Sequence, residues 1–309
     1  MTRALVTGAA GFIGSHLTEK LIDRGYEVRA LDTLATGSLD NLESVSDHDA
    51  FTFIEGDVRD KATLDACIEG VEYVFHQAAV ASVQRSFSEP SVVSDINCTG
   101  SSMLLEAAEE AGVETVVVAS SAAVYGSSGE LPKRESMPVA PESPYALSKQ
   151  YTEQAAVQIG AKYDFNAVGL RYFNVFGPRQ DPEGEYAAVV PKFINLMSSG
   201  ERPTVFGDGE QSRDFVFVDD VVAANIQAAE SGVTGEVFNI ARGERTTINE
   251  LVDQLNEILE GKIEPKYEAP RQGDIRHSVA EISKARSQLE YEPTTSFEDG
   301  LRQTVTQFR

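Results

Sequence analysis

The 309-residue chain has no tryptophan, only two cysteines and four histidines, and no long hydrophobic run. Cys67 and Cys98 lie in apparently helical stretches without metal-ligand spacing, so we expect small core residues, not a disulfide or a metal site. No apolar run approaches the roughly 18 residues that span a bilayer. The N-terminus shows no signal peptide. These absences predict a cytoplasmic protein that binds neither metal nor membrane.

Positive charge is also scarce. Lys and Arg total 26 against 49 Asp and Glu, which gives a net charge of -23, and nine of the basic residues are lysines. Such a surface excludes nucleic acid and anionic membranes as favourable partners. Acidic residues are spread along the whole chain, as in proteins adapted to multimolar salt, where screening removes self-repulsion. An ordinary acidic protein is the alternative interpretation.

Short apolar runs alternate with amphipathic segments over residues 1–170, which is typical of strands alternating with helices. Such alternation implies right-handed crossovers and an open parallel sheet covered on both faces, hence an α/β Rossmann (doubly wound) fold. The expected strands are 3–7, 27–32, 51–54, 71–75, 114–119 and 167–171, and the expected helices are 12–24, 90–111 and 145–161.

The sequence pattern changes beyond about residue 175, where Gly and Pro become more frequent and the expected helices are shorter. We interpret residues 1–175 as the sheet domain and residues 176–309 mainly as a smaller substrate-binding lobe. Two later apolar runs, 215–218 and 236–240, are expected to be strands that return to the main sheet.

A glycine-rich turn follows the first expected strand, with Gly8, Gly11 and Gly14 in GxxGxxG spacing. Glycine permits a tight turn and close backbone approach to a pyrophosphate, while the helix N-terminus offers free N–H groups to the anion. Asp32 ends the next strand, 24 residues after Gly8, where a carboxylate accepts hydrogen bonds from the adenosine ribose. Because a carboxylate repels a 2′-phosphate, the pattern favours NAD over NADP.

Further cofactor contacts are expected at the start of the first helix and at the ends of the third and fourth strands: Phe12, Ile13, Asp57, Val58, Ala78 and Ala79. Asp57 is placed to hold the adenine edge, and its segment, 56–60, is also a plausible helix N-cap. His16 and His76 are interpreted as structural residues.

Tyr145 and Lys149 form a YxxxK pair on one face of an expected helix. The ammonium, helped by a cationic nicotinamide, is expected to lower the tyrosine pKa, so that the phenol can exchange a hydroxyl proton as hydride moves. Ser121 lies at the end of a strand 24 residues before Tyr145, where its hydroxyl can orient the same substrate oxygen. Together with the glycine turn and Asp32, these residues predict a redox-active site.

These motifs resemble the extended short-chain dehydrogenases/reductases of the NAD-dependent epimerase/dehydratase family that act on nucleotide sugars, above all the UDP-glucose / UDP-N-acetylglucosamine 4-epimerase branch. The resemblance runs from residue 4 to about residue 300. The segments that carry it are TGAAGFIGSHL at 7–17, SSAAVYG at 120–126, SPYALSK at 143–149, RYFNVFGP at 171–178, QSRDFVFVDD at 211–220 and GDIRHS at 273–278.

The resemblance implies that Tyr145 is the acid/base, that Lys149 binds the nicotinamide ribose and that Ser121 orients the 4-hydroxyl. It also implies substrate contacts by Ser82, Asn174, Arg213, Arg271, Asp274 and Ser278. The two arginines would face the diphosphate, and surface salt bridges are the alternative. Relatives commonly form homodimers through two helices, although the alanine-rich faces here are equally compatible with packing on the sheet.

The residues after the catalytic serine help to choose among reactions on this scaffold. Related 4,6-dehydratases place carboxylates there, and UDP-glucuronate decarboxylases a glutamate, whereas this chain has Ala122 and Ala123. The groups that remain are a hydride acceptor, one tyrosine and one orienting hydroxyl. They favour reversible oxidation at C4 of a UDP-hexose, with NAD regenerated in each cycle. Ser278 is small enough to admit an N-acetyl group. A UDP-glucuronate epimerase, a net oxidoreductase and a non-catalytic NAD-binding sensor are the alternatives.

Overall fold

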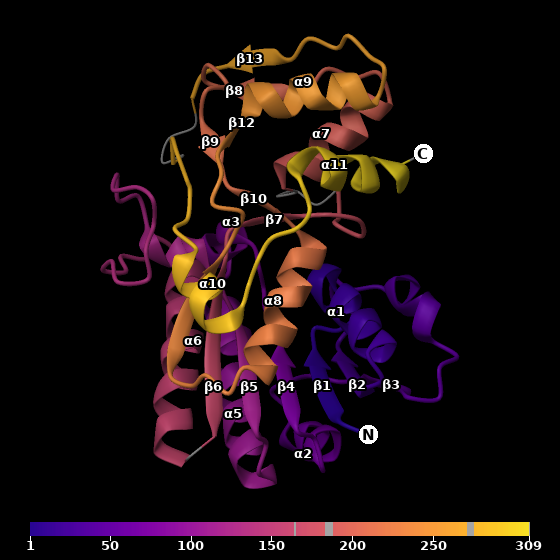
Figure 1. Ribbon diagram of the computed structural model, residues 1–309, viewed down its shortest axis with the longest axis vertical. Coiled ribbons are helices and arrows are strands. Elements are labelled where there is room, and N and C mark those ends of the chain that lie inside the picture. Colours follow the sequence, from indigo (N-terminus) through magenta and orange to yellow (C-terminus); the bar gives the residue numbers. More distant parts are fainter. Residues whose placement is uncertain (164, 183–187, 271–274, 309) are drawn as a thin grey trace.

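The computed structural model describes residues 1–163, 165–182, 188–270 and 275–308. A sheet domain lies beneath a smaller lobe (Figure 1). The seven-stranded main sheet of the described residues has the order β11-β6-β5-β4-β1-β2-β3, and each neighbouring pair is parallel. Its strands are β1 (Arg3–Thr7), β2 (Glu27–Asp32), β3 (Phe51–Glu55), β4 (Tyr73–His76), β5 (Thr115–Ser121), β6 (Asn166–Tyr172) and β11 (Glu236–Ile240).

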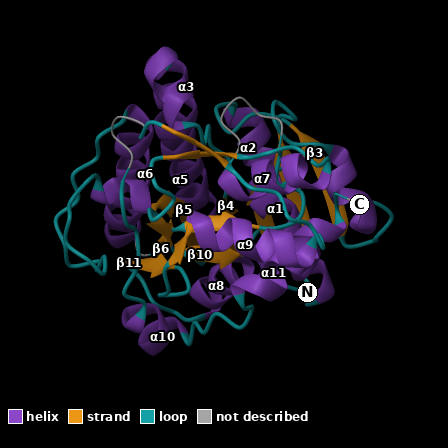
Figure 2. Cartoon of the chain, turned by 90° about the horizontal axis from the view of Figure 1, so that it is seen from above, coloured by secondary structure: helices purple, strands orange, loops and turns teal. Residues whose placement is uncertain are grey.

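Helices cover both faces of this sheet, as expected for a doubly wound fold (Figure 2). Successive residues of β1 point to opposite faces: Ala4 and Val6 join one buried cluster and Leu5 the other. The first cluster includes residues of α1 (Phe12–Asp23) and α8 (Val218–Glu230), and the second includes residues of α2 (Lys61–Ile68), α5 (Gly100–Ala111) and α6 (Pro144–Tyr163). The predicted Rossmann architecture is therefore confirmed.

The helix expected over residues 90–111 contains a local irregularity. It consists of α4 (Pro90–Ser94), a π-helical turn at Asp95–Thr99 and α5. Pro90 stands in the first turn, where its missing N–H costs no helical hydrogen bond. Gly112, with φ +69°, ends α5 in the left-handed conformation. Turns of π-helix inside α-helices occur frequently at functional sites.

The smaller lobe lies above the carboxyl edge of the sheet (Figure 1). Its short strands form two-stranded sheets, β12 with β9 and β13 with β8, while β10 pairs with β7. The elements not yet bounded are the 3₁₀ turns η1 (Leu39–Val45) and η3 (Ala122–Tyr125), the helices α3 (Val83–Ser88), α7 (Val189–Ser198), α9 (Ile248–Ile258), α10 (Ser283–Leu289) and α11 (Phe297–Thr306), and the strands β7 (Asn174–Phe176), β8 (Thr204–Phe206), β9 (Ser212–Arg213), β10 (Phe215–Phe217), β12 (Thr246–Thr247) and β13 (Lys266–Glu268).

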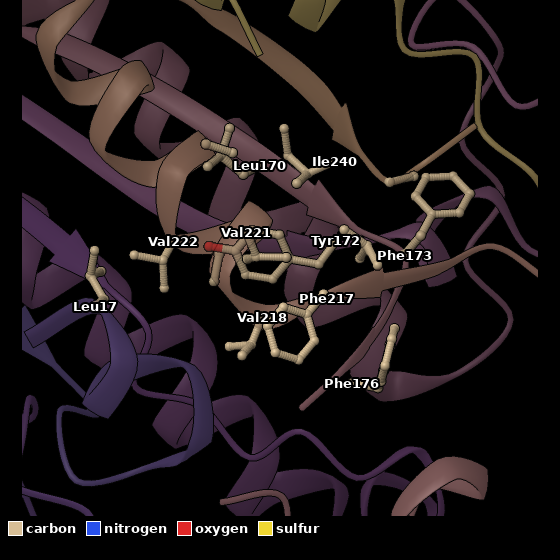
Figure 3. Close-up of a cluster of buried hydrophobic side chains, with 14 of the residues drawn as sticks. Leu17, Leu170, Tyr172, Phe173, Phe176, Phe217, Val218, Val221, Val222 and Ile240 are labelled. Carbon is tan, nitrogen blue, oxygen red and sulfur yellow. The ribbon is translucent and has the colours of Figure 1, made fainter. Parts of the chain in front are cut away.

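One of the two strands expected to return to the main sheet does so. Residues 236–240 form β11 beside β6, whereas residues 215–217 form β10, which pairs with β7 outside the main sheet. The second prediction was wrong because the apolar character of β10 has another cause. Phe217 stacks edge-on against Phe176, with ring centroids 5.6 Å apart, in the buried junction between lobe and sheet (Figure 3).

Among the described residues, no helix has the length and apolar character needed to cross a membrane.

Candidate functional site

The glycine turn, Asp32 and Ser121 lie at or just after the carboxyl ends of β1, β2 and β5, the edge of the sheet that faces the lobe (Figure 1). In an open α/β sheet, ligands bind in the crevice outside this edge. The parallel register brings the strand ends level, since Thr7 of β1 pairs with Leu31 of β2 and with His76 of β4. Loops that are far apart in the sequence therefore meet at one place.

The glycine turn after β1 leaves no room for side chains. A Cβ at Gly8, which has φ +68°, would lie 2.7 Å from the backbone nitrogen of Ala78, and one at Gly14 would lie 2.0 Å from the carbonyl oxygen of Gly8. Gly11 is the N-cap residue of α1 and makes no side-chain capping bond. The N–H groups at the start of α1 are thus left for an anion, and the tight turn suits the pyrophosphate of a dinucleotide.

Asp32 is buried at the end of β2, next to this turn. Its Oδ2 accepts the N–H of Ala10 at 2.9 Å and its Oδ1 accepts the N–H of Leu34 at 2.8 Å. Each carboxylate oxygen has a second lone-pair site, so ribose hydroxyls can donate to it without displacing these bonds. The geometry therefore fits NAD, and the contact of Asp32 with the ribose stays a prediction.

Asp57 follows β3 and is occupied by its near neighbour Arg59, whose backbone N–H and Nε donate to Oδ1 at 2.8 and 2.9 Å. These bonds hold the pKa of Asp57 below its ordinary value. The N-cap of α2 is Asp60, which accepts the N–H of Ala62 at 3.1 Å. The N-cap expected within segment 56–60 is therefore Asp60, because α2 begins at Lys61.

The other expected cofactor contacts lie around the same turn. Phe12 and Ile13 open α1 and are half-buried, and Ala78 and Ala79 are half-buried in the loop after β4. Val58 is buried, in contact with the start of α5. All five lie in segments that follow β1, β3 or β4, and as cofactor contacts they stay predictions.

Ser121 and Tyr145 meet where β5 ends and α6 begins. The Ser121 hydroxyl accepts the N–H of Ala123 at 3.2 Å and donates to the Tyr145 oxygen, which lowers the pKa of the phenol. Burial acts in the opposite direction and is the larger effect, so the pKa of Tyr145 lies above its ordinary value. The neighbouring ammonium, which was expected to lower this pKa, does not contribute to it.

The reason lies in the position of Lys149. Its Nζ donates to the carbonyl oxygen of Ala119 at 2.9 Å, and burial lowers the pKa of Lys149 to about 8. His76 is close by and fully enclosed, with Nδ1 bonded to Thr7 Oγ1 at 2.8 Å and Nε2 to Ser101 Oγ at 2.9 Å. Burial, with the charge of Lys149, lowers the pKa of His76 to about 3. His76 is neutral at physiological pH, in agreement with the structural function predicted for it.

Asn97, in the π-helical turn, joins the cofactor side to the catalytic helix. Its Oδ1 accepts the N–H of Val80 at 2.8 Å, and its Nδ2 donates to the Val80 carbonyl at 3.1 Å and to Ser148 Oγ at 2.9 Å. Asn97 is buried. It holds the loop after β4 beside α6. Sequence reasoning missed it, because its importance depends on partners that are distant in the sequence.

A buried ion pair anchors the same helix to the sheet. Glu153 lies one turn after Lys149 and pairs with Arg171 of β6, with Arg171 Nη2 at 2.6 Å from Oε1 and Nε at 3.0 Å from Oε2. Ser120 donates its hydroxyl to Glu153 Oε2 at 2.7 Å. Side chains of Glu153 and Arg171 are almost completely buried. The pair connects the helix that carries Tyr145 to β5 and β6, and sequence reasoning had not selected it.

A cavity of about 890 Å³ lies between the sheet domain and the lobe. Its volume suits a small-molecule ligand of nucleotide size. Two predicted substrate residues, Asn174 and Arg213, line it, and Ala123 and Ala146 bring its wall next to Ser121 and Tyr145. Its lining includes Ala123, Gly126, Glu142 and Ala146 of the sheet domain and Lys192, Arg213 and Glu268 of the lobe.

The remaining predicted substrate residues are placed differently. Ser82 caps α3 by accepting the N–H of Arg85 at 3.1 Å, and the cavity lining next to it comes from Val83. The N–H of Ser278 donates to the Ser212 carbonyl at 3.0 Å, beside β9. Arg271 and Asp274 lie outside the described residues. Within the described residues, no group of three His, Cys, Asp or Glu side chains is arranged to hold a metal ion.

Known proteins resemble this chain over almost its whole length. Residues 4–241 match the model of the NAD dependent epimerase/dehydratase family. A UDP-glucose 4-epimerase of Mycolicibacterium smegmatis is 40% identical, covering 99% of this chain and 98% of that protein.

Two solved structures share the fold. A UDP-N-acetylglucosamine 4-epimerase from Methanobrevibacter ruminantium, in complex with UDP-N-acetylmuramic acid, has a TM-score of 0.96 and 42% identity, covering 99% of this chain and 98% of its own. A UDP-glucuronic acid 4-epimerase from Bacillus cereus, with UDP-glucuronic acid and NAD, has a TM-score of 0.92 and 30% identity, covering 99% of both chains. With the dinucleotide cradle and the Ser121–Tyr145–Lys149 site, these matches lead to one conclusion: the chain belongs to the NAD-dependent epimerase/dehydratase family.

Proposed function

We propose that the protein inverts C4 of a UDP-hexose, with UDP-glucose/UDP-galactose and their N-acetylated counterparts as substrates. The observation that carries this proposal is the contact between Ser121 and Tyr145 beside a cavity whose adjoining residues, Ala122 and Ala123, bear no acid or base. Relatives that act on UDP-glucose and UDP-N-acetylglucosamine support the choice of substrate.

Each catalytic side chain has a distinct task. Tyr145 takes the proton of the 4-hydroxyl and later returns it, since its oxygen is placed to reach a substrate oxygen held by Ser121. Ser121 donates a hydrogen bond that stabilises the phenolate form of Tyr145. Lys149 supplies the positive charge beneath the nicotinamide ribose. NAD, when bound, would supply the redox chemistry of transient oxidation at C4.

Competing reactions need groups that these positions lack. Elimination of water across C5 and C6 requires an additional acid and base, and alanines at 122 and 123 provide neither. A net oxidoreductase would use the same Tyr145 and Lys149, but it would release reduced cofactor. A non-catalytic sensor would have no need of either residue.

Ser278 is the residue expected to set tolerance of an N-acetyl group at C2. It is half-buried in the segment that pairs with β9, whose Arg213 lines the cavity. Replacing Ser278 by tyrosine is predicted to abolish turnover of UDP-N-acetylglucosamine while sparing UDP-glucose. If N-acetyl activity were untouched in Ser278→Tyr, the assignment of this residue would be wrong.

The test of the proposed function is product analysis. The folded, NAD-loaded protein is incubated in molar KCl with UDP-glucose, UDP-N-acetylglucosamine and UDP-glucuronate in separate reactions, and the sugars are identified by NMR. A C4 isomer formed without net NADH supports the proposal. Three unchanged sugars would contradict it, and accumulation of absorbance at the NADH band would indicate an oxidoreductase.

A homodimer is part of the proposal. Leu147 and Tyr151 on α6 are 58% and 45% exposed, and Val92 on α4 and Phe87 on α3 are 37% and 61% exposed. Because α3 and α4 both contact α6, these apolar side chains belong to one face of the sheet domain. Large exposed apolar groups on adjacent helices are typical of a surface covered by a partner. A second copy of the chain would pack α6 and the 90–111 helix against their counterparts.

A further inference from the structure

Charge is divided unequally around the cavity. Among its described lining residues, the charged side chains are Glu142, Lys192, Arg213 and Glu268. Lys192 of α7, Arg213 of β9 and Glu268 of β13 belong to the lobe. Glu142 alone comes from the sheet domain, three residues before Tyr145. The described wall therefore has its cations opposite the catalytic residues and a lone carboxylate beside them.

Glu142 is fixed in place by the segment that follows the catalytic serine. Its Oε1 accepts the N–H of Ser127 at 3.1 Å and the hydroxyl of Ser127. Gly126, with φ +60°, makes this approach possible, because a Cβ there would lie 2.1 Å from the carbonyl oxygen of Ala140. The bonds from Ser127 lower the pKa of Glu142, which is therefore ionised at neutral pH.

These positions orient a nucleotide sugar in the cavity. Its diphosphate is attracted to Lys192 and Arg213, and C4 of its hexose must reach Tyr145. The groups that flank C4 are the 3-hydroxyl and the substituent on C5, which carries C6. With the diphosphate at the lobe, the hexose faces the sheet-domain wall, whose charged lining residue is Glu142.

We propose that Glu142 determines which hexose the site accepts: its carboxylate receives a hydrogen bond from a hydroxyl next to C4 and repels a sugar that has a carboxylate at C6. This inference rests on the proposed function and names the residue that restricts its substrates to neutral hexoses. Glu142 is exposed, so solvent reduces the repulsion and a high effective dielectric constant applies to it. A hexuronate-specific site would instead need a cation at this place.

A charge series at position 142 tests the inference. The readout is kcat/KM for UDP-glucuronate divided by kcat/KM for UDP-glucose, measured for the wild type, Glu142→Gln and Glu142→Lys. Glu142→Gln is expected to raise this ratio about tenfold. This is the factor that corresponds to the repulsion between two unit charges about 6 Å apart at an effective dielectric constant of about 40. Glu142→Lys is expected to raise it further, since a cation attracts the C6 carboxylate.

Two control variants separate the charge from other effects. Glu268→Gln removes the same charge from the lobe side of the cavity and is expected to leave the ratio within about twofold of the wild type. Ser127→Ala releases the Glu142 side chain without changing its charge, and is expected to raise the ratio less than Glu142→Gln does. A rise in Glu268→Gln equal to that in Glu142→Gln would show a bulk charge effect and would overturn the inference.

The inference and the proposed function fail in different ways. A wild type that epimerises UDP-glucose, combined with an unchanged ratio in both position-142 variants, overturns the assignment of Glu142 alone. A wild type that prefers UDP-glucuronate also overturns it, while leaving C4 epimerisation intact. A folded, NAD-bound wild type that converts none of the sugars refutes the proposed function itself.

Discussion

Replacing Lys149 by methionine is predicted to stabilise the protein and to inactivate it. A pKa that falls from 10.5 to about 8 means that charging Lys149 costs the folded protein about 3 kcal/mol more than it costs the unfolded chain. Methionine keeps the apolar stem and removes this cost at neutral pH. The Ala119 carbonyl loses its donor, which costs about 1 kcal/mol. The net gain in the free energy of unfolding is therefore about 2 kcal/mol.

The pH dependence provides an independent check of the sign. Between about pH 8 and pH 10.5 the unfolded chain still binds the proton that folded Lys149 has lost, so wild-type stability rises with pH in this window. The advantage of Lys149→Met shrinks over the same range and then reverses. Denaturant unfolding of the cofactor-free proteins measures both effects. Wild-type activity should meanwhile decline as pH rises through about 8, because the ammonium is lost.

Lys162→Met is the matched control, since Lys162 is exposed near the other end of the same helix. Its stability should change by no more than about 0.5 kcal/mol. Lys149→Met should lose at least about a hundredfold in turnover, whereas Lys162→Met should not. A Lys149→Met protein less stable than the wild type at neutral pH would refute the argument that burial of the ammonium costs stability.

Three further predictions concern the scaffold and surface. Glu153→Ala leaves Arg171 buried without its partner and should cost about 3–5 kcal/mol in denaturant unfolding, whereas an apolar replacement of both residues should cost less; equal costs would show that pairing is unimportant. Leu147→Glu places a charge on the exposed apolar face and should give a monomer by light scattering, while an unchanged dimer would place the interface elsewhere. The net charge of -23 predicts that the thermal midpoint rises from physiological to multimolar KCl, and a flat or falling midpoint would indicate an ordinary acidic protein.

Local patterns predicted the sheet domain well because its strands are covered on both faces. β5 is nearly all buried, and its central residues, 116–119, form an unbroken apolar run in the sequence. β1 and β2 have the residue limits expected from the sequence, because a glycine turn and an aspartate mark their ends. The strand expected at 71–75 was displaced to Tyr73–His76, since the polar His76 still pairs within the sheet.

Features decided by tertiary contact were harder to predict. The run at 215–218 is apolar because it packs under the lobe, and periodicity cannot distinguish that burial from membership of a sheet. Asn97 and Glu153 act through partners that are distant in the sequence, Val80 and Arg171. Their importance follows from burial of polar atoms, which spacing along the chain does not show.

The candidate site shows the same division. The order of the glycine turn, Asp32, Ser121 and the YxxxK pair was visible in the sequence, because each lies at the end of a strand or on one helix face. The pKa of Tyr145 was not, since burial and the carbonyl that holds Lys149 are properties of the folded site. The position of Glu142 in the cavity wall could not be predicted from the sequence either, because the fold brings it there.

The most direct test of the central claim follows the hydrogen on C4. The NAD-loaded protein is incubated with UDP-glucose deuterated at C4, with unlabelled NADH in the solvent, and the product is examined by NMR and mass spectrometry. The proposed mechanism predicts a C4 epimer that retains deuterium at C4, because the hydride returns to the carbon from which it came. Deuterium found at C6, or replaced by hydrogen from free NADH, would contradict C4 epimerisation by transient oxidation within one bound complex.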